Sequence, residues 1–335
     1  PQPLPGLADG GNSSTGNAFE DTMGAALGLT HTFTPAVVNE LRIGFNYVHI
    51  RRGVPEGGNV EPPSNVLVPG VPNNPGTNGL TIFAPRGYRR EGSPSYAPTI
   101  LASEERQITN VLSLVHGPHS VKVGAEMRWS QFNIFQVPAP NGNFSFSGQF
   151  TQNPSDGDGG SAIADELLGL PSTSTISTLL NMGNRQHVPS GFVQDDFKVS
   201  RKLTLNLGLR YEYFSPLEEV NNKQSNFDYQ TAQLIVAGRN GASRGLVDAD
   251  HRNFAPRLGL AYNPFGQTVL RAAYGIFYSG QEIRTAAPLQ LAYNVPFYTQ
   301  PFFVSDGITP VLTVNQGFPA VNASNAVDPP VTSAD

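Results

Sequence analysis

The sequence predicts an all-β fold, specifically a partial transmembrane antiparallel β-barrel of about eight strands in four hairpins. Gly (35) and Pro (29) are abundant and only 14% of residues are charged, which favours strands, turns and long loops over helices. Several segments alternate apolar and polar residues over about ten positions, the length of a membrane-spanning strand. Short and long connections between them alternate strictly.

The clearest strand is LTLNLGLRYEYF, residues 203–214. Four leucines and two tyrosines occupy every second position. The positions between them are polar or small: Thr204, Asn206, Gly208, Arg210 and Glu212. A soluble sandwich strand usually spans about 5–6 residues, so the length favours a membrane strand, and the tyrosines fit an aromatic girdle at the interface.

Three further segments repeat this pattern, at 41–47, 121–129 and 270–278, where Phe277 alone breaks the polar face of the last one. Each follows another strand across a turn rich in Pro, Gly or polar residues. The predicted hairpins lie near 24–50, 105–133, 187–214 and 253–280.

The long connections, near 51–104, 134–186, 215–252 and 281–335, are interpreted as extracellular loops, and the tight turns as periplasmic. Apolar residues at helical spacing predict a short helix within 161–170, ended by Gly169 and Pro171. In FVQDDFKV, Asp195 shares a face with apolar residues, which indicates a bulge or a position at the membrane interface.

Several function classes are disfavoured. With 21 basic and 26 acidic residues, the chain lacks the positive electrostatic field that holds nucleic acid. The absence of cysteine removes disulfides, thiolate metal sites and cysteine nucleophiles. No hydrolase or nucleotide-binding motif occurs, so we expect a non-enzyme without a cofactor. The chain begins at Pro1 without an initiator Met or the features of an export signal, and we expect a fragment of something longer.

A family resemblance rests on five ordered blocks: NELRIGFNYVH, HSVKVGAEMRW, AIADELLGLPS, GFVQDDFKVSRKLTLNLGLRYEYFSP and NFAPRLGLAYNPFGQTVLRAAYGIFY. Together, over about 37–280, they resemble the barrel domain of Oar-like TonB-dependent receptors, abundant in acidobacteria. The resemblance implies a barrel of roughly 22 strands, filled by a plug domain and energised by the inner-membrane TonB–ExbB–ExbD complex. No plug is recognisable in this chain.

We therefore expect one outer-membrane barrel segment over 1–335, with a recognisable core at about 24–280, an extracellular loop at 281–335 and no plug domain. The expected location is the bacterial outer membrane. The expected function is a part in the uptake of a bulky solute. The implied partners are outer-membrane lipid, an unknown transported ligand, and TonB–ExbB–ExbD acting through the plug of a parent protein.

Charged residues on the polar strand faces are predicted to face the lumen: Arg42, Lys122, Glu126, Arg128, Arg210, Glu212 and Arg271. They could form an ion-pair lattice against a plug, which we favour, or line a polar path for solute.

The aromatics of YNVPFYTQPFFVSDG are candidates for gripping an apolar or sugar ligand, or for packing over the barrel mouth: Phe297, Tyr298, Phe302 and Phe303. Weaker candidates for a metal site are four loop carboxylates, although solvated loops are the preferred interpretation: Asp156, Asp158, Asp248 and Asp250.

Three alternatives remain. The chain could be a secreted β-sandwich with adhesive or carbohydrate-binding loops, or a small closed eight-stranded barrel acting as a surface adhesin. An enzyme would require the loop carboxylates to converge with a general base.

Overall fold

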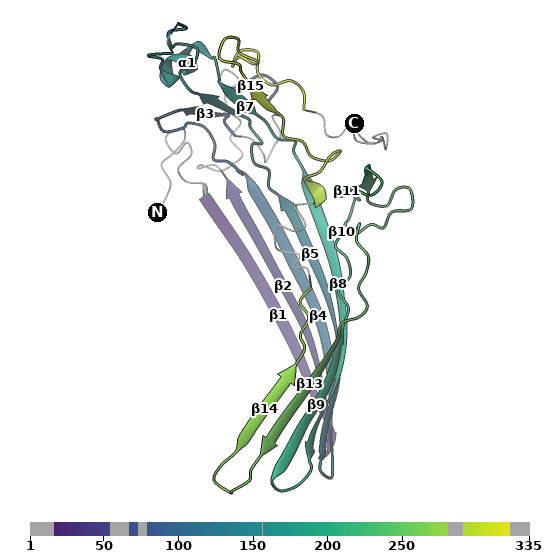
Figure 1. Ribbon diagram of the computed structural model, residues 1–335. Coiled ribbons are helices and arrows are strands. Elements are labelled where there is room, and N and C mark those ends of the chain that lie inside the picture. The colour runs from purple at the N-terminus through teal and green to yellow at the C-terminus, as the bar shows by residue number, and fades with distance from the viewer. Residues whose placement is uncertain (1–16, 54–66, 73–78, 156, 281–290, 322–335) are drawn as a thin grey trace.

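A computed structural model describes residues 17–53, 67–72, 79–155, 157–280 and 291–321 of the chain. Its main feature is a long antiparallel sheet in which eight strands pair in chain order (Figure 1). These strands are β1 (Asn17–Thr34), β2 (Val37–Gly53), β4 (Thr99–His116), β5 (His119–Phe135), β8 (Asn181–Lys198), β9 (Leu203–Glu212), β13 (Phe254–Tyr262) and β14 (Leu270–Gly275). All four predicted hairpins are confirmed.

The first five of these strands are 17 or 18 residues long, which exceeds the roughly 9–11 residues that cross a bilayer. They extend past the predicted hairpin boundaries on the side of the long connections. Figure 1 shows all the tight turns at one end of the sheet and the long connections at the other. The sheet therefore has a turn end and a loop end.

The two faces of the sheet differ in chemistry, and the strand registers keep each face continuous. Ile43 lies opposite Ile108, which lies opposite Met127, and Leu207 lies opposite Leu258. We call this apolar face the outer face. The other, the inner face, carries glycines, polar residues and charges on neighbouring strands, because successive side chains in a strand point to opposite sides.

The long connections contain more structure than expected. A four-stranded sheet joins β3 (Ile82–Pro85), β6 (Asn143–Phe146), β7 (Thr173–Thr175) and β15 (Phe302–Val304). A two-residue strand, β10 (Glu218–Glu219), pairs with β8, and β11 (Ser225–Asp228) forms a hairpin with β12 (Gln233–Val236). The segment 291–321, expected as a loop, thus contributes the strand β15. Alternation over about three or four residues is too short a signal to identify such strands.

The core lies at the loop end, on the inner face. Phe132 and Met182, from β5 and β8, pack with Leu217, Ala292 and Tyr298 from the connections. A second cluster joins Phe144 and Phe146 of β6 to residues of neighbouring connections. The loop layer therefore folds mainly over the polar face of the sheet and leaves most of the apolar face uncovered.

The predicted helix is confirmed as α1 (Ala162–Leu168). Ser161 caps its start by accepting a hydrogen bond from the Ala164 amide, and Gly169 ends it in the left-handed conformation at φ 69°. Among the described residues, no helix is long and apolar enough to cross a membrane.

Of the two interpretations of Asp195, a bulge or a position at the membrane interface, the bulge is wrong. β8 runs in uninterrupted register with both β5 and β9 through this position. Asp195 does share the outer face with Val193, but it lies close to the turn end, where its Oδ2 is 2.6 Å from His119 Nδ1. This partner on the adjacent strand, which sequence spacing does not reveal, contacts one oxygen of the carboxylate, while the buried Oδ1 has no hydrogen-bond partner among the described residues.

Candidate functional site

The inner face carries a cluster of four charged side chains from β5 and β9: Glu126, Arg128, Arg210 and Glu212. We call it the lumen cluster. Glu126 lies opposite Ser190 of β8, which lies opposite Glu212, so three adjacent strands bring these residues into one row. Arg210 lies two residues before Glu212 on β9, and its side chain reaches Glu126, Ser190 and Glu212 on the three strands.

Arg210 is the centre of the lumen cluster. Its Nη2 lies 2.9 Å from Glu212 Oε1 and 3.9 Å from Glu126 Oε2, and it donates a hydrogen bond to Ser190 Oγ at 2.9 Å. Arg128 Nε lies 3.8 Å from Glu126 Oε1. The side chains of Arg210 and its two carboxylates are at most 19% exposed. Such mutual pairing favours a structural lattice over a set of free solute ligands.

The other three predicted lumen residues lie on the inner face but outside this cluster. Arg42 is 70% exposed and pairs with Glu40 on its own strand. Lys122 and Arg271 are exposed nearer the turn end. Ser190 was not singled out from the sequence, because its role depends on a cross-strand register that one sequence does not give.

Phe277, the exception to the polar pattern, follows the end of β14. Its ring lies 4.8 Å from the Arg257 guanidinium, a cation–π arrangement on the inner face. With Gly208, Gly259 and Gly275, it lines a shallow hollow of about 450 Å³ along this face. An aromatic ring is accommodated there because the glycines on the paired strands leave room.

The loop aromatics are placed differently from one another. Tyr298 is 9% exposed in the core, with its Oη 3.2 Å from Ser177 Oγ and 3.0 Å from Gln300 Oε1. Burial raises the pKa of its phenol. Phe303 packs against the second core cluster and Phe297 lines a cavity of about 290 Å³ in the loop layer, whereas Phe302 is 68% exposed.

The candidate carboxylates do not converge. Asp156 lies outside the described residues. The Asp158 carbonyl accepts a hydrogen bond from the Asn153 amide, and Asp250 pairs with Arg252, whose hydrogen bond lowers the pKa of the carboxyl. Asp248 lines a separate cleft. Within the part of the chain that is described, no three His, Cys, Asp or Glu residues gather as a metal site.

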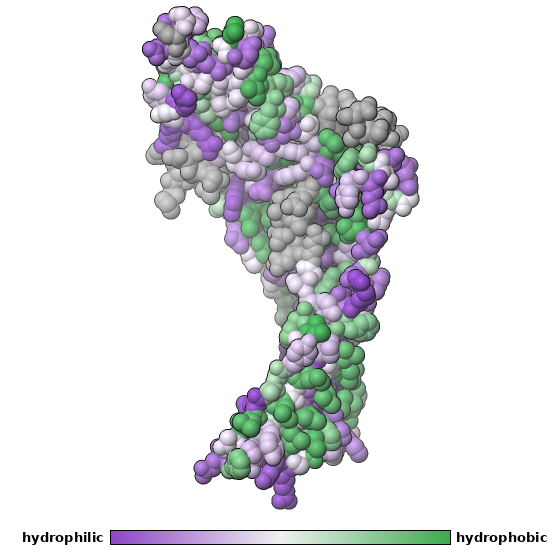
Figure 2. All heavy atoms as spheres, in the orientation of Figure 1, coloured by the Kyte–Doolittle hydropathy of each residue, from purple (hydrophilic) through white to green (hydrophobic). Residues whose placement is uncertain are grey.

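The outer face carries a band of exposed apolar side chains. Leu27 is 67% exposed, Leu258 53% and Leu207 41%. In Figure 2, hydrophobic residues cover the visible surface of the sheet toward its turn end, and hydrophilic residues gather at the loops and at the turn tips. A soluble protein buries such a face, so this band needs an apolar surrounding.

The height of the band can be estimated on β5. Its outer-face residues run from Val121 to Trp129, about 27 Å along the strand at about 3.4 Å per residue. A tilt of about 40° reduces this to about 21 Å, close to the roughly 25 Å apolar band of membrane barrels. Outward apolar residues, an inward charge lattice and loops folded over the inner face define the wall of a membrane β-barrel.

The comparisons agree with this class. The family model described as an outer membrane beta barrel domain matches residues 1–335, and the chain belongs to this family. It is a protein of the bacterial outer membrane, with short periplasmic turns and long extracellular loops. No curated protein matches the chain.

Two solved structures are reported for comparison. The first is P. aeruginosa FpvA bound to heterologous pyoverdines with iron, at 11% identity and a TM-score of 0.34, covering 78% of this chain and 36% of FpvA. The second, the FpvAI–pyocin S2 complex, has 8% identity and a TM-score of 0.24, covering 78% and 35%. The chain thus spans little more than a third of these structures.

Proposed function

We propose that this chain is part of the wall and outer loops of an Oar-like TonB-dependent receptor that takes up a bulky solute. The observation that carries the proposal is the open sheet. Among the described residues β1 pairs only with β2 and β14 only with β13, so eight strands do not close on themselves. Unpaired strand edges are costly in lipid, so further strands must complete the wall.

A closed barrel with more than eight strands has a wide lumen, because diameter grows with strand number. Side chains alone do not fill such a lumen. A wide lumen is suited to a pore that is closed by a plug domain and that passes a large solute. In this proposal residues 1–335 form one barrel segment, with the core at about 24–280 and residues 281–335 in an extracellular loop. The plug that contacts TonB–ExbB–ExbD belongs to the parent protein, and the chain contributes shape and binding, not bond chemistry.

The open sheet argues against the small closed barrel, which would need β1 and β14 to pair. The exposed apolar outer face argues against a secreted β-sandwich, which would bury it. Surface binding by the loops is compatible with a receptor.

The test is to read the complete reading frame around this segment and to express its whole product in a bacterial outer membrane. We expect detergent-dependent extraction, a plug domain, and binding of the purified periplasmic domain of TonB that is lost when the plug is deleted. A protein that needs no detergent, or a complete frame without a plug, would overturn the receptor proposal.

A further inference from the structure

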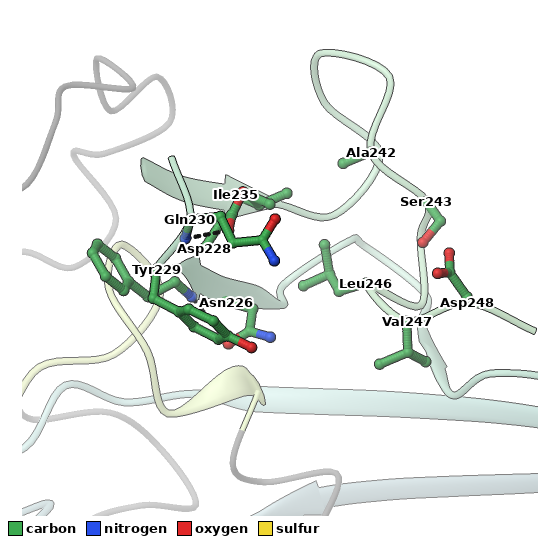
Figure 3. Close-up of a pocket in the computed structure, with 11 residues that line it drawn as sticks. Asn226, Asp228, Tyr229, Gln230, Ile235, Ala242, Ser243, Leu246, Val247 and Asp248 are labelled. Atoms are coloured by element: carbon green, nitrogen blue, oxygen red, sulfur yellow. Dashed lines mark hydrogen bonds between the residues drawn. The ribbon is translucent and has the colours of Figure 1, made fainter. Parts of the chain in front are cut away.

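A cleft lies outside the lumen cluster, in the extracellular connection between β9 and β13. Its volume is about 560 Å³, within the range of about 300–1,000 Å³ typical of ligand pockets. Figure 3 shows two walls, one with Asn226, Tyr229 and Gln230 of the β11–β12 hairpin and one with Leu246 and Asp248 of the following segment. We call it the hairpin cleft.

Both walls are fastened to the loop layer. Ser225, at the base of the first wall, is fully buried and donates through its hydroxyl to the Val295 carbonyl at 2.6 Å, and Asn294 Nδ2 donates to the Ser225 carbonyl at 2.8 Å. The cleft therefore rests on a segment that is distant in sequence but fixed by hydrogen bonds.

The second wall is held by Arg244. Its Nε donates to Asn222 Oδ1 at 2.8 Å, its Nη2 donates to the Glu219 carbonyl at 2.9 Å, and its Nη1 lies 3.2 Å from Glu218 Oε2. A guanidinium with three partners thus fastens the second wall to β10 and to Asn222, which precedes the first wall. A cleft that is shaped before the ligand arrives loses less entropy on binding.

Backbone strain marks the same wall. Leu246 lines the cleft and has φ +56°, a conformation that bulky L-residues rarely adopt. Strain of this kind persists only where surrounding contacts enforce it, and it gathers at binding sites.

The lining combines exposed aromatic rings with oxygen and amide groups. Tyr229 is 84% exposed and Phe227 is 45% exposed. Asn226 and Gln230 add carboxamides, and Asp228 and Asp248 add carboxylates, while none of the lining residues within the described part of the chain is Lys or Arg. Hydrogen bonds from Thr231 and the Gln230 amide hold the pKa of Asp228 below its usual range, so this acceptor stays ionised at neutral pH.

We propose that the hairpin cleft binds a neutral oligosaccharide. The inference rests on the proposed receptor function, because it names the class of solute that the extracellular side meets. Aromatic rings match the apolar faces of sugar rings, while carboxylates and carboxamides match their hydroxyls. Two carboxylates without a compensating cation disfavour anionic ligands such as uronic acid chains or phosphates.

The experiment is calorimetric titration of the complete protein in detergent with neutral hexasaccharides, namely β-1,4-glucan, β-1,3-glucan, α-1,4-glucan and β-1,4-xylan. The anionic probe is hexagalacturonate. We expect saturable binding of at least one neutral probe and none of the anionic one. Tyr229→Ala should weaken this binding at least tenfold, and Asp248→Ala about fivefold.

The matched control is Tyr88→Ala, which removes another exposed tyrosine, 63% exposed, that does not line the cleft. It should leave the affinity unchanged. Equal loss in both tyrosine variants, preference for the anionic probe, or no binding of any neutral probe would overturn the cleft proposal.

The two proposals can fail separately. Binding of the TonB periplasmic domain without any sugar binding would leave the receptor proposal standing and reject the cleft. Sugar binding that depends on Tyr229, in a protein that binds no TonB, would support the cleft and favour a surface adhesin over a receptor.

Discussion

The ring of Phe192 lies directly over Gly124 across the β5–β8 pair. The two residues are register partners on the inner face, and a Cβ built on Gly124 would lie 2.4 Å from Cε1 of Phe192. The ring can occupy the inner face only because its partner has no side chain. Phe192 also lies opposite Arg210, so this contact adjoins the lumen cluster.

Gly124→Ala should destabilise the barrel by about 1–3 kcal/mol, because the Phe192 ring must leave its place in a packed surface. The measurement is urea unfolding of the complete protein in lipid vesicles. Gly44→Ala is the control, because β2 is paired on both sides and a Cβ there would meet only Gln107 Cβ, at 3.9 Å. Equal unfolding midpoints for the two variants would show that the ring moves at no cost.

The hairpins were predictable because their signal is local. Alternation through residues 203–214 predicts the position of β9 to within two residues and assigns its two faces. Gly169 and Pro171 predict the end of α1 without any knowledge of what the helix packs against. The contacts of the lumen cluster were only half predictable. The sequence assigned Glu126 and Arg210 to the inner face, but their proximity depends on the register between β5, β8 and β9.

The loop layer was not predictable, because its order comes from contacts distant along the chain. Tyr298 reaches Ser177, and β15 pairs with β7, across more than a hundred residues. Local sequence periodicity does not predict such contacts. Arg244 is a similar case, since nothing in its local sequence indicates that it joins the second wall of the hairpin cleft to β10.

The orientation of the two faces can be tested with adjacent residues on β4. Ile108 is 38% exposed on the outer face, while Thr109 faces inward opposite Arg42 and Glu126. Ile108→Lys should cost about 2–4 kcal/mol, because it places a charge in lipid, and Thr109→Lys should cost less than about 1 kcal/mol. Folding yields into vesicles and urea unfolding midpoints measure the cost of each substitution. If Thr109→Lys costs more than Ile108→Lys, the assignment of the inner and outer faces is wrong.

Removing the central cation of the lumen cluster should be costly. Arg210→Met leaves Glu126 and Glu212 without their shared partner on a largely covered surface, and we expect a loss of about 1–3 kcal/mol in vesicle unfolding. The double variant Arg210→Met with Glu212→Gln should recover part of this loss. Arg42→Met, at a 70% exposed pair, is the control and should change little. If Arg210→Met leaves the unfolding midpoint unchanged, the lumen cluster does not stabilise the barrel.

The loop layer should become less stable as pH rises, through Glu166 of α1. Partial burial, with the nearby charge of Glu91, raises the pKa of Glu166 above its ordinary value of 4.5. The folded layer then holds a proton that the unfolded chain releases at lower pH. This contribution to stability is complete below the ordinary pKa and disappears as pH rises through the raised folded pKa.

Residues 1–335 contain no cysteine, so within this segment a fluorophore attached at Leu167→Cys, at a residue 83% exposed, reports unfolding around α1 once any cysteine elsewhere in the complete protein is replaced by serine. In urea titrations at pH 4 and pH 8, we expect a higher midpoint at pH 4. Glu166→Gln, made in the labelled protein, should reduce the difference between the two midpoints because its amide does not titrate. Glu91→Gln should reduce it in part, by removing the charge that adds to the effect of burial. An unchanged difference in the Glu166→Gln protein would assign the pH dependence to other groups.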